Sequence, residues 1–334
     1  MYNINWKIQF EAQATKKVYE LAVLYSCEII HDEEQLTDTA KIKLPAFVLN
    51  NALKFESTLQ RGDRVAIWMG YNENPVKSEK LINEFNGFIK EISFKDDILN
   101  IDCEDEIYAF RKPLKDIILP KKNIKQIAEL IIAELKLDIK VESNITVTYD
   151  KFQIKANTGY DILKKIQEET KLDVYIKDKV LYISALYLNK RGEVIYDFAK
   201  NIEKGDLTYK IAEQKDVEVE ITYTDDKGKV HKYYEGKPGG TKIEVKAPTS
   251  DEKTMRQLAQ QALIKNSRDA YEGSITGWLI PYVETGYTAV INDDDYPKKT
   301  GSYYVKKTTT TISENGGVRK IDLGIKLSKP TEPE

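Results

Sequence analysis

Histidine and cysteine are scarce in this chain, which has two of each among 334 residues. Histidine has the side-chain pKa nearest neutrality, and zinc sites are built largely from histidine and cysteine. We therefore expect no histidine-based catalysis or metal site. His31 is predicted to be a solvated loop residue and His231 a solvated residue at a strand edge. Cys27 and Cys103 lie in segments of alternating apolar residues, which favours two buried free thiols over a disulfide or a metal pair.

Long apolar runs are also missing. No stretch approaches the ~18 apolar residues that cross a bilayer, and the first ten residues lack the apolar core of a signal peptide. Lys and Arg total 51 against 54 Asp and Glu, a net charge of −3. Sequence-independent binding of nucleic acid usually needs a basic surface. We expect synthesis in a cytoplasm, no membrane segment and no specific nucleic-acid binding.

The glycines and acidic residues match no catalytic motif. Gly273–Gly277 has its serine in the wrong place for a nucleophile elbow, and Gly236–Gly240 lacks the spacing of a phosphate-binding loop. The acidic residues form two clusters, Asp102, Glu104 and Asp105 after one predicted strand and Asp293, Asp294 and Asp295 between two others. Contiguous acids do not fit a calcium loop, which spaces its ligands at alternate positions. We expect no enzyme activity, no cofactor and no bound metal.

Alternation of apolar and polar residues predicts strands over most of residues 1–110. The chain holds 21 Tyr, a residue type that suits a pleated, half-buried surface. Residues 85–94 and 98–103 are predicted to form a hairpin, whereas residues 46–53 are typical of one or two helical turns. Strands at such short spacing favour a barrel or a sandwich.

The period of the pattern changes at Asn123. Apolar residues then recur three and four positions apart, which predicts a helix capped by Asn123. Thr158 with Asp161 has the form of a capping box for a second helix, and residues 171–183 are typical of a hairpin. We predict a small α/β unit over residues 111–200.

Strict alternation returns at Val217–Tyr223 and predicts a second β domain over residues 201–327. This domain should contain one long helix, with Thr249 and Glu252 as its capping box. Residues 328–334 are predicted to be a flexible tail. The expected fold class is β-rich α+β, with two antiparallel β-barrel domains flanking the α/β unit.

A faint internal repeat supports two related β domains. In each half, a glycine precedes two alternating apolar residues, then a second glycine-containing strand and a hairpin. The first copy comprises Gly62, Val65, Ile67, Gly87–Ile89 and Leu99–Ile101, and the second comprises Gly286, Ala289, Ile291, Gly301–Val305 and Ile321–Leu323. Chance similarity between hairpins is the alternative.

The order of these segments resembles the baseplate hub proteins of contractile phage tails, also called late control D proteins. It is similar as well to the N-terminal half of the type VI secretion spike protein VgrG. The stretches that carry the resemblance are residues 62–105, 158–183, 253–270, Gly286 and 301–305. They span most of the chain, and the resemblance lies in their order and spacing.

This resemblance implies two tail-tube-like barrels per chain and a homotrimeric ring whose six barrels join a six-fold tail tube to a three-fold spike or tail tip. The implied partners are the tail tube or distal tail protein, a separate spike or tail-tip protein and a tape-measure protein. The implied location is a virion tail or baseplate, assembled in the bacterial cytoplasm. Because the pattern stops near Leu327, we expect any spike or lytic domain to belong to another polypeptide.

Two alternatives remain open at this point. Tyr-rich strands and abundant carboxylates also suit a carbohydrate-binding or glycan-processing β protein, and a two-domain surface adhesin is a third possibility. For a hub, a lumen wall of negative charge would keep DNA from adhering. At least one of the two acidic clusters is therefore expected to face the lumen of the ring, the alternative being ordinary solvated turns.

Overall fold

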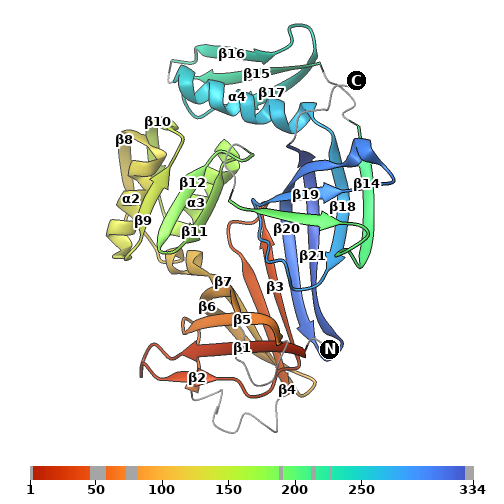
Figure 1. The fold of residues 1–334 in the computed structure, drawn as a ribbon. Helices are drawn as coiled ribbons and strands as arrows, with labels where there is room; N and C mark the ends of the chain where they lie inside the picture. Colours follow the sequence, from red (N-terminus) through yellow and green to blue (C-terminus); the bar gives the residue numbers. More distant parts are fainter. Residues whose placement is uncertain are drawn as a thin grey trace.

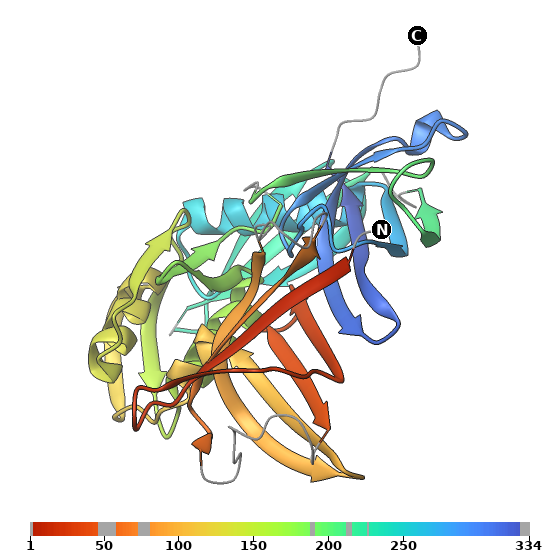
Figure 2. The same cartoon turned by 60° about the horizontal axis from the view of Figure 1, so that its bottom comes forward.

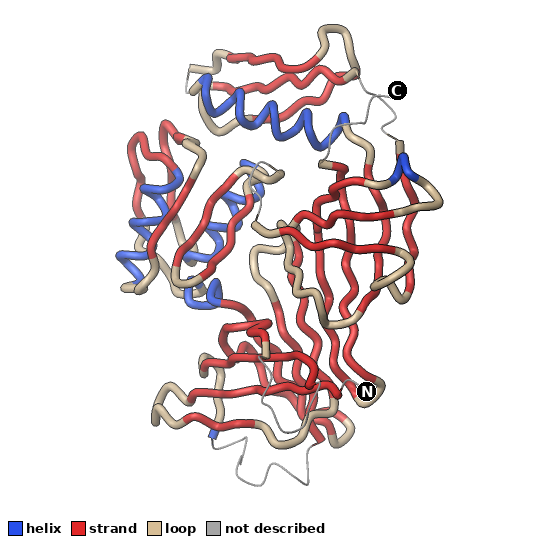
Figure 3. Tube along the Cα trace, in the orientation of Figure 1, coloured by secondary structure: helices blue, strands red, loops and turns tan. Residues whose placement is uncertain are grey.

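The computed structural model describes residues 3–45, 58–72, 81–187, 191–211, 216–225 and 227–327. The helical turns predicted at residues 46–53 and the tail predicted at residues 328–334 lie outside the described residues. Strands dominate the described part, and the longer helices lie in the middle unit and in one separate layer (Figure 3). The β-rich α+β class is confirmed. Among the described helices, none combines the length and the apolarity needed to cross a membrane.

The first β region is built from one contiguous stretch of chain. Its strands are β1 (Asn3–Glu11), β2 (Val18–Glu20), β3 (Ser26–Asp32), β4 (Thr39–Pro45), β5 (Arg64–Asn72), β6 (Ile82–Lys95) and β7 (Ile98–Asp105). The predicted hairpin is present, since β6 and β7 pair antiparallel up to Lys95 and Ile98. Alternate residues such as Ile8, Phe10 and Ile29 are fully buried and build one aliphatic core.

The α/β unit follows directly. It contains the 3₁₀ helix η1 (Glu106–Phe110), β8 (Ile117–Asn123), α2 (Ile124–Leu135), β9 (Lys140–Ser143), β10 (Thr148–Ile154), α3 (Gly159–Thr170), β11 (Asp173–Lys177) and β12 (Val180–Ser184). Both predicted helix starts are confirmed. Asn123 caps α2 and Thr158 caps α3, each in a reciprocal capping box. The apolar faces of the two helices share one core with the strands of the unit.

The second β region is assembled from separated pieces of chain. Its strands are β13 (Glu193–Asp197), β14 (Lys204–Lys210), β18 (Ala270–Gly277), β19 (Thr288–Asn292), β20 (Gly301–Ser313) and β21 (Gly316–Lys326), with the 3₁₀ helix η2 (Pro297–Lys299) between β19 and β20. Its core includes the buried Tyr196, Tyr271 and Tyr303.

A separate layer interrupts this region between β14 and β18 (Figure 1). It consists of β15 (Val217–Thr224), β16 (Val230–Gly236), β17 (Thr241–Lys246) and α4 (Glu252–Ser267), which packs on this three-stranded sheet with a core of its own. The alternation at Val217 therefore belongs to an inserted sheet. The predicted Thr249–Glu252 capping box is wrong, because Asp251 caps α4 by accepting a hydrogen bond from the Thr254 backbone N–H at 2.9 Å.

The two β regions have the same strand order. The path β3–β4–β7–β6–β5–β1 in the first corresponds to β14–β18–β21–β20–β19–β13 in the second, position by position along the chain. Gly62 and Gly286 occupy matching places with φ of +92° and +85°. Their backbone N–H groups donate to the carbonyls of Ile89 on β6 and Val305 on β20. The repeat seen in the sequence thus corresponds to a repeated topology.

One strand joins the two regions. The first half of β20 pairs with β19, and its second half, Lys307–Ser313, pairs antiparallel with β3. The result is a continuous 13-stranded sheet. The α/β unit lies beside this sheet, away from the β20–β21 hairpin, in both ribbon views (Figures 1 and 2).

Candidate functional site

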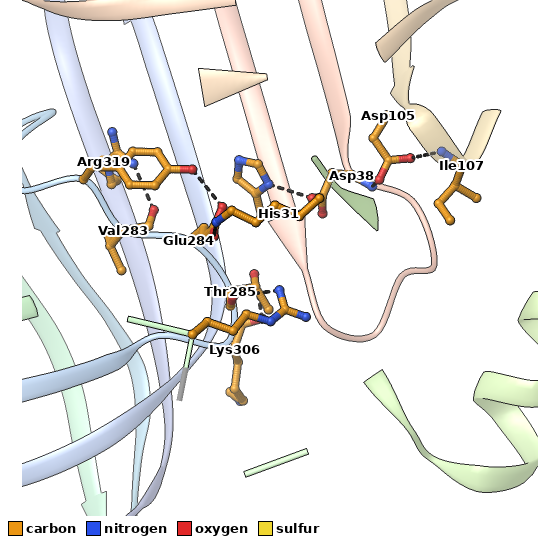
Figure 4. A network of polar contacts seen from close by, with 12 residues as sticks. His31, Asp38, Asp105, Ile107, Val283, Glu284, Thr285, Lys306 and Arg319 are labelled. Atoms are coloured by element: carbon orange, nitrogen blue, oxygen red, sulfur yellow. Dashed lines mark hydrogen bonds and ion pairs between the residues drawn. The ribbon is translucent and has the colours of Figure 1, made fainter. Parts of the chain in front are cut away.

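A group of charged side chains, three of them buried and two partly buried, lies where the two β regions meet. We call His31, Asp38, Glu84, Glu284 and Arg319 the charged junction. All of these except Glu84 are labelled in Figure 4. They come from β3, the loop after it, β6, the segment before β19 and β21. A cavity of about 600 Å³ borders this junction, lined in part by His31, Asp38, Glu84 and Glu284.

Arg319 and Glu84 form the centre of the junction. Both side chains are essentially inaccessible to solvent, and Arg319 Nη2 donates to Glu84 Oε1 at 2.6 Å. Arg319 also donates to the backbone carbonyls of Val283 and Leu279, each at 2.9 Å. Burial raises the pKa of Glu84, and the neighbouring Arg319 charge opposes that rise. The pair ties β21 of the second region to β6 of the first.

His31 differs from its prediction. It lies on β3 rather than in a loop, and it is buried rather than solvated. Its Nδ1 is 2.7 Å from Oδ2 of Asp38, the last residue of the loop between β3 and β4. Burial by itself lowers the pKa of His31, but Asp38, Glu284 and Glu84 together outweigh it and raise the pKa to about 9. The imidazolium is therefore the stable form at neutral pH.

The α/β unit is attached to the same place by ion pairs. Lys177 of β11 donates to Glu284 at 2.6 Å. Arg191 pairs with Asp173, donates to the Thr285 carbonyl at 3.1 Å and stacks 3.3 Å above the Tyr175 ring. The three parts of the molecule thus meet through charge-assisted contacts as well as through apolar packing.

The first predicted acidic cluster divides into three environments. Glu104 is buried, and it receives hydrogen bonds from Arg111 at 2.5 and 2.8 Å and an ion pair from Lys90 at 2.8 Å. Burial alone would raise the pKa of Glu104, yet these two cations lower it. Asp105 caps η1, and burial with the nearby Asp38 raises its pKa. Asp102 remains partly exposed, 3.4 Å from Lys41.

The second cluster is an exposed turn after β19. Asp293 organises it by accepting a hydrogen bond from the Tyr296 backbone N–H at 3.0 Å, whereas Asp294 and Asp295 are exposed. The structure does not bring the two clusters together, because β20, β3 and β4 separate β19 from β7 in the sheet.

The cysteines and His231 each have an ordinary structural environment. Cys27 and Cys103 are buried free thiols, as predicted, and burial raises the pKa of both. His231 lies on the edge strand β16, partly exposed, with its Nε2 3.1 Å from Asp225. In the described ranges, no group of three or more His, Cys, Asp or Glu side chains is arranged to hold a metal ion.

Sequence reasoning missed the charged junction as a whole. Its one available signal is the position of Arg319, which shares a strand face with the buried Gly317, Ile321 and Leu323. An arginine on an apolar strand face needs a buried partner. The sequence does not indicate that the partner is Glu84, which lies 235 positions away.

Several solved structures share this architecture over nearly the whole chain. The 43 kDa tail protein of prophage MuSo2 from Shewanella oneidensis matches 96% of this chain and 98% of its own, with a TM-score of 0.61 and 14% identity. The tail protein from Neisseria meningitidis matches 98% of both chains, with a TM-score of 0.63 and 12% identity. The chain has the fold of these phage tail proteins.

A protein from a secretion machine shares the phage tail protein fold. A component of the Escherichia coli type VI secretion system matches 93% of this chain and 76% of its own, with a TM-score of 0.57 and 11% identity. That component is itself structurally similar to the T4 bacteriophage tail proteins gp27 and gp5. No protein-family model and no curated protein sequence matches the chain. The resemblance drawn from segment order is confirmed at the level of fold.

Proposed function

We propose that this protein is a structural hub subunit of a phage-type tail or a related contractile injection machine. The observation that carries the proposal is the match of nearly the full chain to tail proteins from two bacteria and to a type VI secretion component. The proposed role is structural and not enzymatic. In it, the chain joins the six-fold tail tube to a three-fold spike or tail tip in the virion tail or baseplate.

Each β region is proposed to act as one tube-like barrel, with the predicted bounds 1–110 and 201–327. Strand β13 (Glu193–Asp197) is added to the second barrel because it pairs with β19. The α/β unit, predicted over residues 111–200, lies beside the barrels without that strand. The repeated strand order supports two equivalent modules per chain. Three chains would then present six modules around one channel. Contacts in such a ring run head to tail and close only at a fixed rotation. The charged junction would hold the two modules of one chain at that rotation.

The acidic turn Asp293–Asp295 is proposed to face the lumen, where its charge would repel DNA phosphates. Asp102 is the second candidate, because its carboxylate is partly exposed. Glu104 is enclosed by Arg111 and Lys90, and Asp105 caps η1, so neither is a principal candidate for a channel wall.

The oligomer and its place in the particle are open to direct measurement. Light scattering of the purified protein should give a trimer, or a monomer that becomes a trimer on adding the tail tube or spike protein. A stable dimer or tetramer at all concentrations would contradict the ring. A density map of the assembled particle tests the lumen separately. The acidic wall is wrong if both clusters lie outside and Lys and Arg line the channel.

A further inference from the structure

A cavity of about 590 Å³ lies between the first β region and the α/β unit, apart from the charged junction. We call it the basic cleft. Its walls come from the turns before β2 and β5, from β6, from η1 and the residues after it, from the loop between α2 and β9, and from β11 with the turn that follows. The volume is in the range of about 300–1,000 Å³ that is typical of ligand sites.

The charge of this cleft is opposite to that of the chain. The net charge of the whole protein is −3. The cleft, however, is lined by five cationic side chains against the two carboxylates Glu106 and Asp138. The cationic residues are Arg61, Arg64, Arg111, Lys112 and Lys179.

Three of these five cations already have acidic partners. Arg64 pairs with Glu106 at 2.9 Å, Lys179 pairs with Asp138 at 2.7 Å, and Arg111 is held by Glu104. Within the part of the chain that the structure describes, no acceptor reaches Lys112 Nζ or the terminal nitrogens of Arg61, whose Nε donates to the Tyr108 hydroxyl at 3.1 Å.

A third donor without a partner lies in the same wall. The Nε2 atom of Gln13 is buried and has no hydrogen-bond partner among the described residues. The unmatched groups of Gln13, Arg61 and Lys112 are thus all donors. A ligand that satisfies them must bring acceptors, and two of the three donors are cations, so those acceptors should be anionic oxygens.

The aromatic and aliphatic walls narrow the class of ligand. The Phe88 and Tyr108 rings stack on one another at 5.4 Å, and the Arg64 guanidinium covers the Phe88 ring at 4.8 Å. The Phe88 ring is thus contacted by both Tyr108 and Arg64, and one face of Tyr108 is used, so this pair offers little platform for stacking nucleic-acid bases. Leu137, Ile139 and Ile176 add an apolar side that suits the aliphatic side chains of a peptide.

We propose that the basic cleft binds an acidic peptide segment of a partner protein. Two carboxylates of the peptide pair with Arg61 and Lys112, and an apolar side chain between them contacts the Leu137 and Ile176 wall. This inference is independent of the proposed ring, because the cleft lies within one chain and its chemistry does not require a trimer.

The test uses the full chain and a fluorescein-labelled peptide of alternating glutamate and leucine. Fluorescence anisotropy should show saturable binding that weakens as salt is added, since exposed charges are screened. A peptide in which glutamine replaces glutamate should not bind. The double variant Arg61→Gln/Lys112→Gln should weaken binding by about tenfold or more, since each hydrogen bond between charged groups contributes appreciably to affinity.

The matched control is Lys121→Gln/Lys125→Gln, which removes the same charge from exposed positions on β8 and α2. It should bind the peptide like the unaltered protein. All four substituted residues are exposed, so both double variants should fold, as thermal unfolding would verify. Equal weakening in both variants, or no binding of the acidic peptide, would overturn the proposal. Tight binding of single-stranded oligothymidylate that displaces the peptide would overturn it in favour of nucleic acid.

Discussion

The two β regions share a strand order but differ in how the chain builds them. In the first, β3 and β4 are joined by the short loop at residues 33–38. In the second, the equivalent strands β14 and β18 are separated by residues 211–269, which contain the inserted sheet and α4. The first strand also differs, since β1 runs antiparallel to β5 whereas β13 runs parallel to β19.

The two regions also differ in the side chains that form their hydrophobic cores. The core of the first region is mainly aliphatic and comes largely from one stretch of chain, although it also includes Leu279 and Ile312 of the second. The core of the second region contains several tyrosines, whose hydroxyl groups need hydrogen-bond partners. Because the first core includes residues of the second region and β3 pairs with β20, we expect the two regions to unfold together despite their separate origins in sequence.

The largest expected effect comes from cutting the buried ion pair between the regions. Arg319→Met leaves Glu84 buried without its partner, and breaking such a pair costs about 3–5 kcal/mol. Chemical denaturation should show that loss in the free energy of unfolding. The double variant Arg319→Met/Glu84→Leu removes both charges and should recover most of it. A double variant as unstable as the single one would mean that the pair does not act as a unit.

Matched cavities compare the two cores directly. Ile101→Ala in the first region and Ile321→Ala in the second each truncate a fully buried side chain and should cost about 2–5 kcal/mol. Calorimetry should still show a single transition for both variants, because the sheet is continuous through β3 and β20. If only one of two resolved transitions moves in each variant, the regions are thermodynamically separate.

The junction should also make stability depend on pH. His31 has a folded pKa raised from 6.5 to about 9, so its contribution is fully present below about pH 6.5 and is lost as the pH rises through about 9. The loss is on the order of 3 kcal/mol. His31→Gln should remove that dependence, whereas His231→Gln, on the exposed edge of β16, should leave it in place. Parallel pH profiles for the unaltered protein and His31→Gln would contradict this assignment.

The smallest effect concerns the tyrosine core. The Tyr303 hydroxyl donates to the Lys299 carbonyl at 2.5 Å, so Tyr303→Phe should cost about 1 kcal/mol through the lost hydrogen bond. Tyr234→Phe, at an exposed position on β16, is the control and should have almost no effect. If both variants leave the thermal unfolding temperature almost unchanged, the hydrogen bond of the Tyr303 hydroxyl does not stabilise the second core.

The helices could be predicted because their signals are local. Asn123 and Thr158 cap α2 and α3 through residues three positions on, within the span that a pattern can reveal. The inserted layer could not be separated from the second β region, since alternation at Val217 reports a strand and not its partners. His31 was misplaced for a related reason. Its acidic neighbours indicated a loop, but its burial depends on how β3 registers against β20.

The shared strand β20 has a mechanical consequence. Residues 307–313 of β20 pair antiparallel with residues 26–32 of β3. The hydrogen bonds of this pairing run across the strands, so a force along the strands acts on all of them together. A pull that slides one β region past the other along the strands stretches all of these hydrogen bonds at once, so none can give way alone. A pull across the strands peels the same bonds open one after another. The molecule is therefore stiff to shear along β20 and weaker to opening across it, which gives its resistance to force a direction.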